Sequence, residues 1–121
     1  MNTDEPMTVV IALIRPNMEG RVVQAPHDLP EFPGFFIGEG RGQGRGRGAG
    51  GAYISAETEL SYHRTLRMEI VCPSASAEMV CSRIREAAWT GRKGDGVVFT
   101  TAALTLTRIR EGAPRSEGNS E

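Results

Sequence analysis

LRMEIVCP (residues 66–73) is followed without a break by SASAEMVCSRIREAA (residues 74–88), and the periodicity of the chain changes at the join. Up to Pro73 every second residue is apolar, which is typical of a half-buried strand. Ser74 is a residue type that caps helices, and after it apolar residues recur on one helical face, namely Ala77, Val80, Ile84, Ala87 and Ala88. We therefore predict a strand that turns directly into an amphipathic helix.

The flanking segments extend this unit in both directions. Thr8–Ile14 is an apolar run typical of a buried strand, and Asn17 is expected to cap a helix that Pro26 kinks or shortens. Phe35–Ile37 opens a second strand, and residues 97–109 form the last one. This order predicts an α+β fold of the ferredoxin-like type, βαββαβ, in which both helices cover one face of an antiparallel sheet.

Size and charge limit the classes of function. The chain has 121 residues, 14 Lys and Arg against 15 Asp and Glu, and 39% hydrophobic residues. It lacks the basic excess that drives nonspecific nucleic-acid binding, and its core is thin, so we expect one domain over residues 1–112 that associates with copies of itself. Residues 113–121 contain almost no apolar side chain and are expected to form a disordered tail.

Localisation and redox state follow from short stretches. Val9–Ile14 is too short to cross a bilayer, and Met1–Glu5 has no basic region typical of a secretory signal, so we expect a cytoplasmic protein. Cys72 and Cys81 lack metal-binding spacing, and we interpret them as buried, reduced thiols.

TGRKGDG, residues 90–96, is the strongest chemical signal. Its glycines allow backbone N–H groups to turn toward an anion, and Arg92 and Lys93 raise the local positive potential. An ordinary helix-to-strand turn has a similar composition. Arg108 and Arg110, placed by strand periodicity on one side of the last strand, favour a phosphate site.

The glycine- and arginine-rich segment Gly38–Gly51 is interpreted as a mobile loop without a fixed backbone. It could bind RNA through Arg41, Arg45 and Arg47, although no aromatic residue is interleaved with them. No catalytic constellation is found, so we expect no enzyme.

These residues together resemble the PII signal-transduction family, the nitrogen regulatory proteins P-II. The resemblance covers Val9 to about Gly112, and its specific motifs are Arg15-Pro16, Arg41–Arg45, Glu69–Pro73, Thr90–Gly96 and Arg108–Arg110 with Gly112. It implies a homotrimer of ferredoxin-like subunits that binds an adenine nucleotide, ATP, ADP or AMP, in the clefts between subunits. It also implies that a T-loop, about residues 45–62, contacts a regulated partner protein, and that residues 90–96 form the B-loop.

The resemblance also assigns site residues. It places Leu13 and Val71 beside the adenine, and Arg108 and Arg110 on the phosphates across the subunit boundary. The other nucleotide-binding residues that it implies are Gly42, Gly44, Arg45, Thr90, Gly91, Arg92, Lys93, Gly94, Asp95 and Gly96.

Departures from the family pattern change what is expected of the ligand. Val97 stands where the family commonly has a phosphate-binding lysine, which favours ADP or AMP over ATP. Gly46 replaces a glutamine that helps to hold Mg²⁺ and 2-oxoglutarate, and Thr65 replaces a lysine that pairs with oxoglutarate. Both departures argue against binding of 2-oxoglutarate, and the first also argues against binding of Mg²⁺. Thr58 replaces the tyrosine that is uridylylated in some members.

These departures indicate a divergent PII-like branch, with a membrane transporter as a candidate partner and bicarbonate as a candidate effector. Two other classes stay open. One is a CutA-like, metal-responsive trimer that uses His63, Cys72 or Cys81, and the other is a nucleic-acid binder that uses the arginines of the glycine-rich segment.

Overall fold

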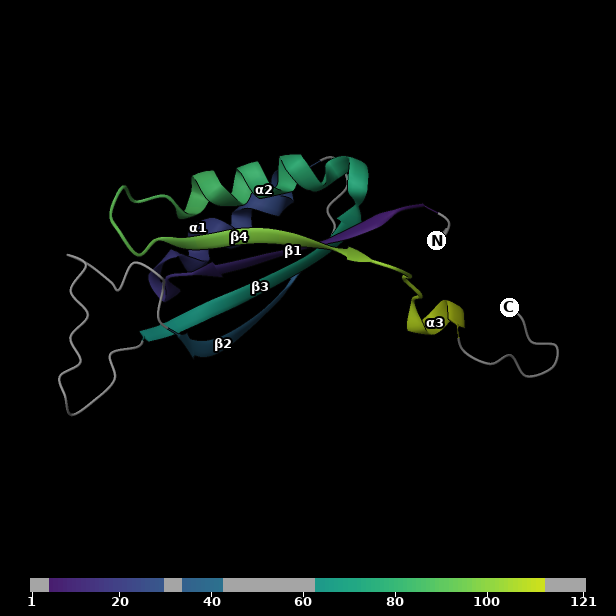
Figure 1. The fold of residues 1–121 in the computed structure, drawn as a ribbon, viewed down its shortest axis with the longest axis horizontal. Coiled ribbons are helices and arrows are strands. Elements are labelled where there is room, and N and C mark those ends of the chain that lie inside the picture. Colours follow the sequence, from purple (N-terminus) through teal and green to yellow (C-terminus); the bar gives the residue numbers. More distant parts are fainter. Residues whose placement is uncertain (1–4, 30–33, 43–62, 113–121) are drawn as a thin grey trace.

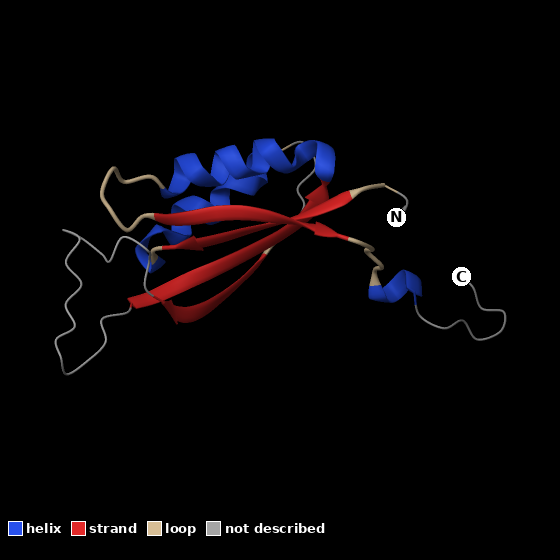
Figure 2. Cartoon of the chain, in the orientation of Figure 1, coloured by secondary structure: helices blue, strands red, loops and turns tan. Residues whose placement is uncertain are grey.

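The computed structural model describes residues 5–29, 34–42 and 63–112, and the order of elements is the predicted one. The elements are β1 (Met7–Ile14), η1 (Pro16–Met18), α1 (Glu19–Gln24), η2 (Ala25–Asp28), β2 (Phe36–Gly42), β3 (His63–Pro73), α2 (Ser74–Ala88), β4 (Gly96–Ala103) and α3 (Ile109–Gly112). The four strands form one antiparallel sheet in the order β2-β3-β1-β4. Helices α1 and α2 lie together on one face of it (Figures 1 and 2). The predicted arrangement of two helices on a four-stranded antiparallel sheet is confirmed.

The core lies between this sheet face and the two helices. Val10 is paired with Ile70 on β3 and with Thr100 on β4, so β1, like β3, is a central strand of the sheet. Alternate residues of β1 and β3 point toward α2, where Val80 and Ile84 are buried against them. Burial of these aliphatic side chains is the main force that holds the sheet and helices together.

The two cysteines belong to this layer. Cys72 is buried on β3, Cys81 on α2 is half-buried, and both are free thiols. Burial raises the pKa of each thiol above its ordinary value, with smaller contributions from Cys81 on Cys72 and from Glu78 on Cys81. Both thiols are therefore protonated at neutral pH, which agrees with the interpretation of reduced, packed cysteines.

The first helical segment is shorter than expected, and Asn17 does not cap it. Pro16 begins one 3₁₀ turn and Pro26 is the second residue of another, Ala25–Asp28, which leaves α1 only 6 residues. Pro26 lacks the N–H group that an α-helix interior needs, so α1 does not continue through it. Ser74 is likewise no cap: it is the first residue of α2, and its hydroxyl shares a hydrogen bond of 2.6 Å with that of Thr8.

The last strand is also shorter than expected, because its pairing partner ends. β4 stops at Ala103, which pairs with Met7, the first residue of β1, and α3 begins at Ile109. The predicted strand over residues 97–109 is therefore wrong beyond Ala103. The expectation of a loop without fixed backbone from Gly38 is wrong for Gly38–Gly42, which belong to β2 and pair with β3. Residues 43–51 lie outside the described residues.

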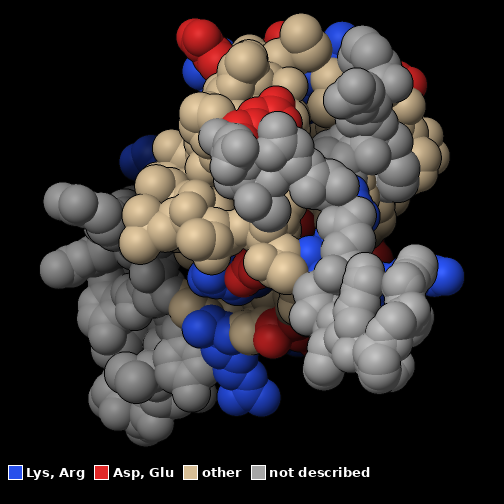
Figure 3. Space-filling model, turned by 90° about the vertical axis from the view of Figure 1, so that its right-hand side faces the viewer, with Lys and Arg blue, Asp and Glu red and all other residues tan. Residues whose placement is uncertain are grey.

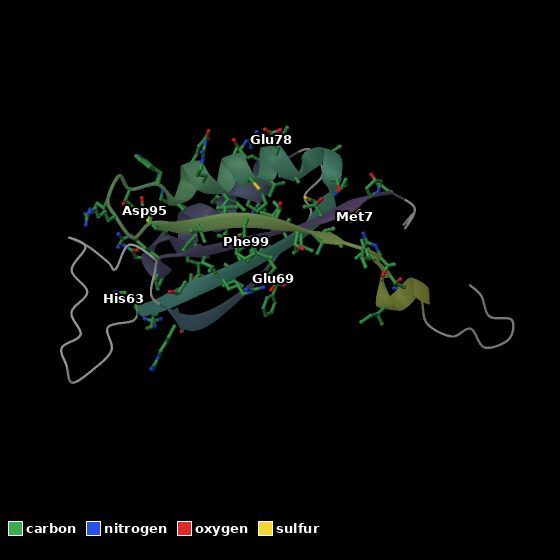
Figure 4. All side chains as sticks on the ribbon, in the orientation of Figure 1. Met7, His63, Glu69, Glu78, Asp95 and Phe99 are labelled. Atoms are coloured by element: carbon green, nitrogen blue, oxygen red, sulfur yellow. The ribbon has the colours of Figure 1, made fainter. Side chains whose placement is uncertain are left out.

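The face of the sheet opposite the helices is called the open face here. Val9, Leu13, Val71, Val97 and Phe99 lie on it by the alternation of the strands. No described helix covers this face, and Phe99, at the centre of β4, is 44% exposed (Figure 4). The same face also carries an ion pair between Arg67 Nε and Glu69 Oε2, which are 2.7 Å apart.

Candidate functional site: the B-loop

The B-loop connects the end of α2 to the start of β4 at one end of the sheet. Three of its glycines, Gly91, Gly94 and Gly96, have positive φ angles of 87°, 88° and 112°. Such angles suit glycine alone among common residues, so the turn depends on all three. The predicted loop at residues 90–96 is therefore present as a defined turn.

Asp95 organises the inside of this turn. Its Oδ2 accepts hydrogen bonds from the backbone N–H groups of Thr90, at 2.8 Å, and Gly91, at 3.2 Å, while its Oδ1 accepts the Thr90 hydroxyl at 2.5 Å. These bonds, first that of the Thr90 hydroxyl and then those of the backbone and Arg15, lower the pKa of Asp95 from 3.8 to about 2. The carboxylate is therefore charged at neutral pH and is occupied within the loop.

Arg15 joins the B-loop to the end of β1, and the sequence alone did not reveal this role. Its Nε donates to Asp95 Oδ1 at 3.2 Å, and its Nη2 donates to the carbonyl of Lys93 at 2.5 Å. The sequence marked Arg15 only as half of an Arg-Pro pair, because a contact that spans 80 positions leaves no local pattern.

The other two basic side chains of the loop face outward. Arg92 and Lys93 are exposed, and neither side chain has a hydrogen-bond or ion-pair partner among the described residues. The Arg92 N–H is already bonded to the Thr90 hydroxyl, at 3.1 Å. The loop thus offers two unpaired cations on a backbone fixed from inside, an arrangement suited to an anionic group.

Arg108 and Arg110 lie beyond the end of β4, at the opposite end of the sheet from the B-loop, so the prediction that both project from the last strand is wrong. The loop precedes Gly96, at the start of β4, and both arginines follow Ala103, at its end. With a rise of about 3.3 Å per residue, the two ends of β4 are roughly 25 Å apart. Figure 4 shows Asp95 and Met7, which pairs with Ala103, at opposite ends of the sheet. Figure 3 views the end with α3, where basic and acidic side chains are interspersed.

The remaining predicted site residues are only partly brought together. Leu13 lies beside the loop, because its neighbour Ile14 pairs with Gly96 and Leu13 itself pairs with Val97. Val71 pairs with Val9, farther along the open face. Gly42 ends β2 opposite His63. Gly44, Arg45 and the T-loop lie outside the described residues.

Trp89 lies outside the core of the single chain. It follows α2 directly, is 66% exposed, and its indole lies next to Gly91, 3.9 Å from where a side chain on Gly91 would begin. A hollow formed with Arg85 and Glu86 lies beside it on the outer side of α2.

The metal hypothesis uses His63, Cys72 or Cys81, and the described residues of one chain do not bring the three together. His63 begins β3 while Cys72 lies near its other end, and no group of three candidate ligands is found in the ranges 5–29, 34–42 and 63–112. No helix in these ranges is long and apolar enough to cross a membrane.

Comparison with known proteins agrees with the fold. The family model described as Nitrogen regulatory protein P-II matches residues 7–113. Proteins named Nitrogen regulatory protein P-II are 32% identical over 106 residues in Azospirillum brasilense and 33% identical over 106 residues in Rhizobium meliloti, in both cases covering 88% of this chain and 94% of the relative. The crystal structure of Arabidopsis thaliana PII bound to citrate superposes with a TM-score of 0.70 at 23% identity, covering 95% of this chain and 94% of that one.

These matches define a regulatory protein of ferredoxin-like fold. The chain belongs to the PII family, the nitrogen regulatory proteins P-II, and is a signalling protein of that family. The resemblance stated from the sequence is confirmed.

Proposed function

We propose that this protein forms a homotrimer, binds an adenine nucleotide in the clefts between its subunits, and regulates a partner protein through its T-loop. The observation that carries the proposal is the separation of the B-loop from Arg108 and Arg110 along β4. If all of these residues contact one nucleotide, the two arginines must come from another copy of the chain. The proposal includes no catalytic activity.

The open face supports the assembly. Apolar side chains of β1, β3 and β4 line it, and Val97 and Phe99 are about half exposed in the single chain. Leu104 and Ile109, which follow β4, are almost fully exposed, at 93% and 90%, and the segment that carries them extends away from the body (Figure 1). Contact with further copies would remove these apolar surfaces from water, which is the main driving force for association.

The B-loop is suited to hold the nucleotide's phosphates. Arg92 and Lys93 supply unpaired positive charge, and the nucleotide would supply the negative charge that they lack. Leu13, beside the loop on the open face, gives an apolar surface for the adenine. Val97, opposite Leu13, adds no cation, so we propose ADP or AMP rather than ATP as the preferred ligand, with no requirement for Mg²⁺.

Nucleotide binding can be followed through Trp89, the single tryptophan of the chain, which lies beside Gly91. We expect AMP, ADP or ATP to change its fluorescence, with no gain in affinity from ADP to ATP. Val97→Lys should strengthen ATP binding relative to AMP by about fivefold, the factor that corresponds to an ion pair of roughly 1 kcal/mol.

Val97→Gln is the matched control, because it introduces a long polar side chain without charge. If the lysine and glutamine variants show the same ratio of ATP to AMP affinity, residue 97 does not lie near the terminal phosphates. If none of the three nucleotides binds the wild-type protein at millimolar concentration, the proposed function is wrong.

The regulated partner is proposed to be a metabolic enzyme or a membrane transporter, with bicarbonate or another small molecule as an additional effector. The support is membership of the PII family and the divergent residues Gly46 and Thr58 of the T-loop and Thr65 of β3. Affinity purification with and without ADP tests this directly. A partner retained under one of the two conditions and released under the other supports regulation by nucleotide.

A further inference from the structure

We propose that Arg15 is a positioning residue for the nucleotide site: it holds the B-loop in its binding shape through Asp95 and the Lys93 carbonyl, and does not itself bind phosphate. This inference deepens the proposed function and rests on it. It starts from the position of Arg15, which directly follows β1, a strand that is paired on both sides.

The guanidinium contacts the loop at two points on either side of Gly94. Nε bonds to the carboxylate of Asp95, and Nη2 bonds to the carbonyl of Lys93. A side chain on Gly94 would begin 3.2 Å from Nη2, so the loop backbone lies directly against the guanidinium. The Arg15 side chain is 32% exposed and that of Asp95 is 18% exposed, so this contact is partly shielded from water.

The hydrogen-bond donors of the loop show how the effect of Arg15 spreads. The Asp95 carboxylate accepts hydrogen bonds from the backbone N–H groups of Thr90 and Gly91 and from the Thr90 hydroxyl. The same Thr90 hydroxyl accepts a hydrogen bond from the backbone N–H of Arg92. Three successive backbone donors are therefore bound to groups that depend on the position of Asp95. Because Arg15 fixes that carboxylate, it also fixes the direction in which the side chains of Arg92 and Lys93 leave the loop.

The same contacts argue against a direct role for Arg15. Its charge is matched by Asp95 at 3.2 Å, whereas the side chains of Arg92 and Lys93 have no partner among the described residues. An anion would be drawn to the unmatched cations first. Arginine suits the inner position because its planar group donates in two fixed directions at once, which a lysine ammonium on a flexible stem does less well.

The test compares Arg15→Ala, Arg15→Lys and wild type in binding AMP, ADP and ATP, followed by Trp89 fluorescence. We expect Arg15→Ala to weaken all three nucleotides by a similar factor, about tenfold, and Arg15→Lys to recover part of the loss. Without nucleotide, the amides of Thr90 and Gly91 should exchange hydrogen faster in Arg15→Ala by about tenfold or more.

Arg64→Ala is the matched control, because it also removes an arginine paired with a carboxylate, Glu39, at 3.0 Å, but on an exposed part of the sheet. It should leave nucleotide affinity and amide exchange in the loop unchanged. Circular dichroism confirms that each variant is folded, and Arg15→Lys keeps the test usable if Arg15→Ala is not.

Two results would overturn the inference. If the loss of affinity in Arg15→Ala grows from AMP to ADP to ATP, Arg15 binds the phosphates directly. If Arg15→Ala binds all three nucleotides as tightly as wild type, Arg15 does not contribute to the nucleotide site. Failure of the proposed function looks different: wild type then binds no nucleotide, which removes the role in binding, while amide exchange still reports whether Arg15 fixes the loop.

Discussion

Replacing Gly96 by alanine is expected to lower the free energy of unfolding by about 3 kcal/mol. A Cβ atom at this position would lie 1.9 Å from the carbonyl oxygen of Leu13. The φ angle of 112° is also one that residues with a side chain rarely adopt. Because Leu13 belongs to a central strand, the clash can be relieved only by moving the start of β4 and with it the B-loop. Urea unfolding at matched protein concentration measures the change.

Gly20→Ala is the control for this substitution, and its effect should have the opposite sign. Gly20 lies within α1, and a side chain there would meet nothing within 4 Å. Alanine is the better helix former, so we expect a gain of about 0.5 to 1 kcal/mol. Equal effects of the two variants would contradict the close approach of the B-loop to β1.

If the protein forms the proposed trimer, Phe99→Glu is expected to convert it into monomers at micromolar concentration. Phe99 lies at the centre of the open face, so the variant would place a carboxylate against apolar side chains of the neighbouring subunits. Leaving a charge buried without a partner costs several kcal/mol for each site, and a trimer contains the change three times. Because the side chain is already 44% exposed in the single chain, the subunit itself should remain folded.

Met79→Glu gives the matched comparison. Met79 is 48% exposed, nearly the same as Phe99, but it lies on α2, on the other side of the sheet. Light scattering coupled to gel filtration should find Met79→Glu trimeric and Phe99→Glu monomeric. If both variants remain trimeric, the open face is not the subunit interface.

The sequence predicts those parts of the fold that have a local pattern. The alternation from Leu66 to Cys72 and the helical spacing from Ala77 to Ala88 correspond closely to β3 and α2, because each pattern follows from one buried face. The end of β4 could not be predicted in this way. Residues after Ala103 still resemble a strand, but β1 provides no further partner for their hydrogen bonds.

The site shows the same division. The glycines of one short segment predicted the turn of the B-loop, because that feature is local, whereas its binding of an anion stays a prediction. The contact of Arg15 with Asp95 joins residues that are 80 positions apart, so it follows only from the pairing of β1 with β4. The distance between the B-loop and Arg108 likewise depends on how far β4 extends, and the sequence overestimated that length.

The central claim is that each nucleotide site takes its B-loop from one subunit and Arg108 and Arg110 from the next. Mixed trimers of two variants test this claim most directly. One variant carries Arg92→Ala with Lys93→Ala, and the other carries Arg108→Ala with Arg110→Ala. Each variant alone should bind ADP poorly, because every site in its trimer lacks one half. Refolded together in equal amounts, they should recover wild-type affinity at about a quarter of the sites, because that fraction pairs an intact loop with intact arginines from the neighbour. No recovery in the mixture, or wild-type binding by the Arg108 and Arg110 variant alone, would contradict the account.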